Sequence, residues 1–120
     1  MFDHIGLHVT NLNASVRFYT ALLAPLGHVA GSLDESSAGF GPSGAPALWL
    51  YADGKPRGPG VHVAFHAANR QAVDHCHAAG MEAGGRDNGA PGLRRDYSPT
   101  YYAAFLLDPD GNNVEAVCLT

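Results

Sequence analysis

The segment HIGLHV at residues 4–9 returns 58 residues later as HVAFHA at residues 62–67. In both copies apolar residues alternate with histidine or a small residue, and an asparagine follows, Asn11 in the first copy and Asn69 in the second. Self-similarity at a fixed spacing is typical of a duplicated structural unit. Because the spacing is about half of the 120-residue chain, the sequence predicts two tandem modules.

Each module is predicted to begin with a half-buried strand, because its apolar and polar residues alternate with a period of two. A helix should follow over residues 14–23 in the first module and 69–79 in the second, where apolar residues recur at helical spacing. Pro25 and Gly27 are expected to end the first helix, and Gly80 the second. Three shorter strands per module are predicted at residues 28–32, 38–40, 47–52, 83–86, 101–107 and 113–119.

These elements predict an α+β fold built from two β-α-β-β-β modules in one domain, residues 1–120. Module 1 would span residues 1–53, a polar, Pro- and Gly-rich linker residues 54–59, and module 2 residues 60–120. A module of about 60 residues is marginally stable by itself, so its apolar face should pack against its twin, in the same chain or in a second one. The longest irregular stretch, residues 86–102, is interpreted as a loop that forms one wall of a pocket.

Composition and charge narrow the classes of function. The chain is 46% hydrophobic and 15% charged, with a formal net charge of -4, so it lacks the basic field that attracts nucleic acid. No apolar run approaches the ~20 residues that span a bilayer, and Asp3 stands where a signal peptide would be basic. We therefore expect a cytoplasmic protein whose partner is a small molecule, with no nucleic acid and no membrane.

Histidine is abundant, with seven residues, and the strand pattern limits how these side chains can combine. His4 and His8 would lie roughly 13 Å apart along one strand, too far to share an ion. A metal site must then combine residues across the repeat, either His4 with His62 or His8 with His66. Glu115 is the only acidic residue in a strand-like apolar segment, and burial of its carboxylate would be costly without a cation.

Three segments carry a more specific signal: DHIGLHVTNLNASVRFYTALLAPLG at 3–27, VHVAF at 61–65 and YYAAFLLDPDGNNVEAV at 101–117. Together they resemble the vicinal oxygen chelate superfamily, which includes glyoxalase I, extradiol dioxygenases, fosfomycin-resistance thiol transferases and bleomycin-binding proteins. The resemblance covers essentially the whole chain and implies a concave, mixed-sheet half-barrel. Its strongest element, DPDGNNVE at 108–115, ends in that superfamily on a metal-ligating glutamate.

The resemblance implies that His4, His62 and Glu115 ligate one divalent ion per site. Glyoxalase I has a further ligand on its fourth strand, but residues 47–51 read ALWLY, with Trp49 at the position that corresponds to Glu115. Two histidines and one carboxylate suit Fe, Mn, Ni or Zn and leave open positions for a bidentate oxygen substrate. The implied function is a metal-dependent, glyoxalase-like lyase or isomerase acting on a small metabolite with vicinal oxygens.

Alternatives from other classes stay open. An extradiol-type dioxygenase would need Fe(II) and a His or Tyr acid near the metal, whereas a protein of the bleomycin-binding type would sequester its ligand without catalysis. A metal-bearing relic that serves association is a third reading. Arg94 or Arg95 could contact an anion, and Tyr101 or Tyr102 could donate a hydrogen bond. The substrate pocket is predicted to include His8, Trp49, His66, Arg94, Tyr101 and Tyr102.

A homodimer with sites between modules is the last expectation. Two small modules leave free sheet edges, which a closed two-fold pairing satisfies best. In the resembled superfamily the first module of one chain often faces the second module of its partner. His4 of one chain would then meet His62 and Glu115 of the other.

Overall fold

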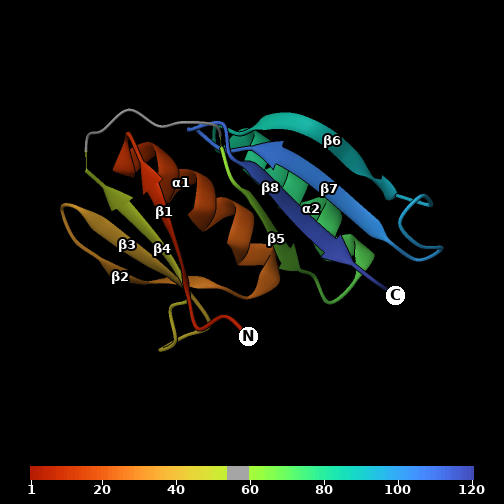
Figure 1. The fold of residues 1–120 in the computed structure, drawn as a ribbon, viewed down its shortest axis with the longest axis horizontal. Coiled ribbons are helices and arrows are strands. Elements are labelled where there is room, and N and C mark those ends of the chain that lie inside the picture. The colour runs from red at the N-terminus through yellow and green to blue at the C-terminus, as the bar shows by residue number, and fades with distance from the viewer. Residues whose placement is uncertain (54–59) are drawn as a thin grey trace.

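The computed structural model describes residues 1–53 and 60–120, and its elements form two β-α-β-β-β modules (Figure 1). The predicted α+β class is confirmed, while the predicted linker at 54–59 lies outside the described residues. Module 1 contains β1 (Ile5–Val9), α1 (Leu12–Leu23), the short 3-10 helix η1 (Ala24–Leu26), β2 (Val29–Leu33), β3 (Ser37–Gly41) and β4 (Leu48–Ala52). Module 2 contains β5 (His62–His66), α2 (Arg70–Glu82), β6 (Arg86–Leu93), β7 (Tyr102–Leu107) and β8 (Asn113–Cys118).

Each module has one four-stranded mixed sheet, and the two sheets repeat the same topology. The strand orders are β1-β4-β3-β2 and β5-β8-β7-β6, with the first pair of each sheet parallel and the other pairs antiparallel. Gly6 pairs with Trp49 in the first sheet, and Ala64 pairs with Glu115 in the second. Trp49 and Glu115 therefore occupy equivalent positions in the two modules.

Both helices begin at an asparagine cap, as the repeated pattern suggests. The side chain of Asn11 accepts a hydrogen bond from the Ala14 amide at 3.0 Å, and that of Asn69 accepts one from the Ala72 amide at 2.8 Å. Each cap satisfies an amide that has no partner within its helix.

Two predictions based on glycine and proline are wrong. Residues 86–93 form the edge strand β6 instead of an irregular loop, because an edge strand tolerates Pro91 and a bulge at Gly89. Helix α2 does not end at Gly80 but continues to Glu82. A Cβ at Gly80 would lie 2.4 Å from Leu106 Cδ1, so this glycine permits close packing of α2 on the sheet.

The two modules share a core within one chain. Buried side chains of α1, β1, β3 and β4 belong to the same apolar cluster as Val63, Leu106 and Val114 of module 2, and α1 packs against α2. Packing between the modules therefore does not require a second chain. Among the described residues, neither helix has the length and apolar character needed to cross a membrane.

The turn between β7 and β8 joins module 2 to module 1 through a buried carboxylate. Asp108 accepts hydrogen bonds from the backbone amides of Asp110 and Asn112, from the Asn112 side chain, and from the Tyr19 hydroxyl of α1 at 2.7 Å. Burial, together with the Asp108 carboxylate, raises the pKa of Tyr19, which therefore remains a donor. Asp110 also accepts a hydrogen bond from the Thr10 amide at 3.0 Å.

We expect Asp108→Ala to lower the free energy of unfolding by about 3 kcal/mol or more, because it removes buried hydrogen bonds and leaves polar groups unpaired. Urea unfolding measures the loss. Glu35→Ala, which removes an exposed carboxylate, is the control and should change stability by less than about 0.5 kcal/mol. Equal effects of the two substitutions would contradict a structural role for Asp108.

Candidate functional site

Glu115 is the centre of a polar cluster on the face of the second sheet that points away from the core. Its neighbours Val114 and Ala116 lie in the apolar core, so strand alternation turns Glu115 to the other face. The residue is nevertheless only 2% exposed. Its Oε2 lies 2.8 Å from Nε2 of His62, and its Oε1 accepts a hydrogen bond from the Tyr101 hydroxyl at 2.5 Å.

The spacing of these two groups fits a shared metal ion. Nitrogen and oxygen ligands bind such ions at about 2.0–2.2 Å, so two adjacent ligands are roughly 3 Å apart. His62 Nε2 and Glu115 Oε2 are separated by 2.8 Å. Within the described residues, His62 is the only ion-pair partner of Glu115. Two of the three predicted ligands are thus in contact, and one of them is a buried carboxylate that a cation would stabilise.

His4 precedes β1 and has a carboxylate partner that sequence reasoning missed. Its Nδ1 lies 2.7 Å from Asp3 Oδ1, the second-sphere arrangement that commonly orients metal-binding histidines and leaves Nε2 for the ion. Within the described ranges, however, no group of three or more His, Cys, Asp or Glu side chains could hold a metal. One chain therefore does not bring His4 together with His62 and Glu115.

The two tyrosines predicted for the pocket lie on opposite faces of the sheet. Tyr101 donates to Glu115, and this hydrogen bond raises the pKa of the tyrosine to about 12. Tyr102 instead donates to Asp74 of α2 at 2.7 Å and lies under the Arg70 guanidinium. Only Tyr101 is therefore placed to act on the Glu115 cluster.

The two arginines predicted as anion contacts also differ. Arg95 is exposed, whereas the Arg94 guanidinium lies 5.4 Å from the centre of the Phe105 ring. Phe105 pairs directly with Glu115 in the sheet, and its ring is 6.3 Å from that of His62. We did not anticipate Phe105, although its period-two spacing from Tyr101 was a usable signal.

The remaining predicted pocket residues do not join the Glu115 cluster. His8 pairs with Asp53 at 3.2 Å and lies beside the ring of Tyr51. Trp49 lies close against Gly39, where a Cβ would be 2.9 Å from its ring. His66 is exposed on β5.

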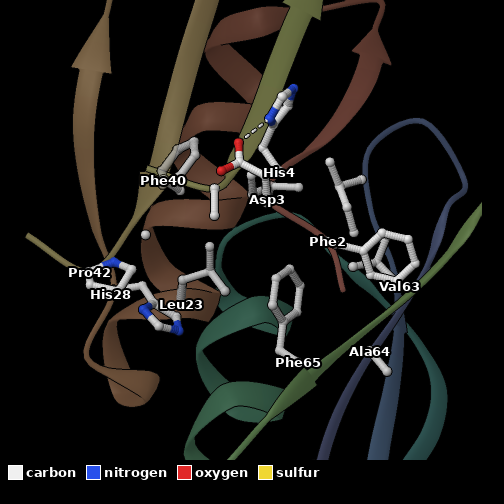
Figure 2. Close-up of a pocket in the computed structure, with 14 residues that line it drawn as sticks. Phe2, Asp3, His4, Leu23, His28, Phe40, Pro42, Val63, Ala64 and Phe65 are labelled. Atoms are coloured by element: carbon white, nitrogen blue, oxygen red, sulfur yellow. Dashed lines mark hydrogen bonds and ion pairs between the residues drawn. The ribbon is translucent and has the colours of Figure 1, made fainter. Parts of the chain in front are cut away.

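A separate cavity of about 200 Å³ lies between the modules (Figure 2). Val63, Ala64 and Phe65 of β5 line it, whereas neither His62 nor Glu115 belongs to its described lining. Of the predicted site residues, only His4 contributes to its described lining. The cavity and the Glu115 cluster are therefore two different features.

Comparison with known proteins identifies the family. The sequence matches the family model for the Glyoxalase/Bleomycin resistance protein/Dioxygenase superfamily over residues 1–116, and no curated protein matches it. A glyoxalase/bleomycin resistance protein from Albidiferax ferrireducens T118 has 34% sequence identity and a TM-score of 0.83, over 98% of this chain and 97% of that one.

More distant structures share the fold. A glyoxalase/bleomycin resistance protein/dioxygenase family enzyme from Burkholderia phytofirmans PsJN has 17% identity and a TM-score of 0.74, over 98% of each chain. A glyoxalase/dioxygenase from Nostoc punctiforme has 21% identity and a TM-score of 0.71, over 100% of this chain and 91% of that one. With a family match that spans nearly its whole length, the chain belongs to the glyoxalase/bleomycin resistance protein/dioxygenase superfamily.

Proposed function

We propose that this chain is a metal-dependent enzyme of the lyase or isomerase type that acts on a small metabolite with two adjacent oxygens. The observation that carries the proposal is the buried Glu115 carboxylate, 2.8 Å from His62 Nε2. A bound Fe, Mn, Ni or Zn ion would supply Lewis acidity to the two substrate oxygens. Trp49, at the position equivalent to Glu115, leaves the ligand set without a fourth protein ligand.

The residues around Glu115 have separate tasks in this proposal. His62 and Glu115 would hold the ion, and Tyr101 would fix the carboxylate by donating to Oε1, so that Oε2 stays directed at His62. The hydrogen bond also helps to satisfy a carboxylate that water barely reaches. Tyr101 thus orients the ligand set before substrate binds.

The proposal includes a homodimer in which His4 of a second copy completes the site. His4 carries its own orienting carboxylate, but the described residues of one chain place no cluster of three metal-ligating side chains around it. Apolar side chains near both halves of the site are also exposed, including Phe2, Ile5 and Val61. A second copy would cover apolar surface and join the two halves.

A second candidate function is extradiol-type ring cleavage, and one contact favours it. Such chemistry needs an acid near the metal, and the Tyr101 hydroxyl lies 2.5 Å from Glu115 Oε1. Protein loaded with Fe(II) under anaerobic conditions and then mixed with catechol and oxygen tests this candidate. Formation of the ring-opened product, followed by its absorbance, would favour the dioxygenase over the lyase or isomerase.

The first test of the proposal is metal content. Protein purified without chelator or affinity-tag nickel should contain about one divalent ion per chain by elemental analysis, because each chain supplies one His62–Glu115 pair. Metal-free protein should bind at least one of Fe, Mn, Ni and Zn in calorimetric titration. Protein that is isolated without metal and rejects all four ions would contradict the proposal and favour a non-catalytic binding protein.

A further inference from the structure

Four residues form a row straight across the second sheet, on the face that carries the proposed metal site. Ala64 pairs with Glu115, Glu115 with Phe105, and Phe105 with Gly89. Directly paired residues project from the same face of a sheet, and neighbouring strands are about 4.8 Å apart. Gly89 therefore lies roughly 10 Å from Glu115 along this row, with Phe105 between them.

Arg94 fills the space above the glycine end of this row. A Cβ at Gly89 would lie 3.2 Å from Nη2 of Arg94, and a Cβ at Gly92 would lie 3.2 Å from Nη1. The guanidinium donates from Nη1 to the Gly92 carbonyl at 2.9 Å and from Nη2 to the Ala90 carbonyl at 2.7 Å. Two glycines thus leave room for the side chain, and two backbone carbonyls hold it in place.

The held guanidinium keeps both its charge and most of its donors. An arginine has five N–H groups and stays protonated in proteins, and the described residues accept hydrogen bonds from two of them. Among the described residues, none of the salt bridges of the chain involves Arg94. The guanidinium lies over the face of Phe105, 5.4 Å from the centre of the ring, where the two groups form a cation–π contact. The Arg94 guanidinium is thus positively charged, half-buried and held in place, and no described residue forms a salt bridge with it. Such a group is suited to bind an anion of a ligand.

We propose that Arg94 binds an anionic end of the substrate, whose vicinal oxygens lie at the His62–Glu115 end. This inference rests on the proposed function, because the metal position is the second anchor. The substrate class is then a carboxylate with two adjacent oxygens at its far end and a short apolar segment, such as one ring, against Phe105. The roughly 10 Å between Glu115 and Gly89 limits the length of that segment.

Zinc-loaded protein tests the inference by binding, without any measurement of turnover. The probes are 3,4-dihydroxybenzoate and its methyl ester, which present the same pair of oxygens and the same ring but differ in the charge of the far end. Because Zn(II) is redox-inert, the ring is not cleaved. We expect calorimetry to show that the wild-type protein binds the acid at least about tenfold more tightly than the ester, the contribution of a charge-assisted hydrogen bond.

Arg94→Gln should remove this preference and leave the affinities for Zn(II) and for the ester unchanged. Arg95→Gln is the matched control, since it removes the same charge from the adjacent, exposed residue, and it should keep the preference. Arg94→Lys retains the charge without the planar fork, and we expect it to keep part of the preference. Arg94→Lys provides the test of the inference if Arg94→Gln does not fold.

Three results would overturn the inference while the proposed function stands. The first is that the zinc-loaded wild type binds the acid and the ester with equal affinity. The second is that protein that holds zinc does not bind the acid. The third is that Arg94→Gln and Arg95→Gln lose the preference for the acid equally. Failure of the proposed function is recognised separately, because the wild type would then bind none of Fe, Mn, Ni and Zn in the titration that precedes the probes. The inference would fall with it.

Discussion

Replacing Glu115 with glutamine is expected to abolish the rise in melting temperature that a divalent ion gives to the wild-type protein. An ion that binds only the folded form, at a hundred times its Kd, adds about 2.7 kcal/mol of stability. For a domain of this size that corresponds to about 10 °C. Glutamine keeps the shape and can still bond with Tyr101 and His62, but it removes the anionic ligand. The measurement is thermal unfolding with and without the ion.

Two histidines of β5 give a matched control for this prediction. His62 and His66 lie on the same face of the strand, but only His62 contacts Glu115. His62→Ala should lose the metal-dependent rise as Glu115→Gln does, whereas His66→Ala should keep it. His8→Ala should keep it as well, because His8 pairs with Asp53 in the other module. If all four variants respond alike, the assignment of the ligands is wrong.

A mixture of two metal-dead variants is expected to regain metal binding if each site is shared between two chains. His4→Ala and Glu115→Gln proteins, unfolded together and refolded, would form dimers by random pairing. Every mixed dimer has one intact site and one doubly damaged site, so about a quarter of the wild-type sites should return. Each variant refolded alone should bind no metal. Calorimetric titration of the refolded mixture counts the sites.

The same mixture distinguishes the two possible arrangements of the ligands. If His4, His62 and Glu115 met within one chain, neither variant could supply an intact site, and the mixture would bind no metal. A mixture of His4→Ala with His62→Ala should behave as the first mixture does. A mixture of His62→Ala with Glu115→Gln should recover nothing, because both residues belong to the same half of the site.

The repeat in the sequence was enough to predict the element order of both modules, since strand alternation and helical spacing are local properties. Asn11 and Asn69 cap the helices as their positions in the repeat suggest. For these features the pattern of neighbouring residues is sufficient.

Local sequence patterns gave wrong predictions of secondary structure where contacts with a distant segment outweigh the intrinsic propensity of the residues. Residues 86–93 contain two glycines and a proline, which favour a turn, yet their pairing with β7 makes them a strand. Gly80 was expected to stop α2, but the contact with Leu106 needs a residue without a side chain inside the helix. In both cases the deciding partner is distant in the sequence.

The sequence by itself determined the duplicated α+β architecture, because alternation and repeat register depend only on spacing along the chain. The pairing of His62 with Glu115 was implied by the family resemblance, since the residue pattern alone left His8 with His66 as an alternative. Only the tertiary structure decided that Arg94 rather than Arg95 lies on that face, and that Tyr101 and Tyr102 point to opposite sides. It also decided that His4 stays apart from Glu115 in one chain. These outcomes depend on how the two modules and the edge strand pack, and periodicity along the chain does not encode contacts between segments so far apart.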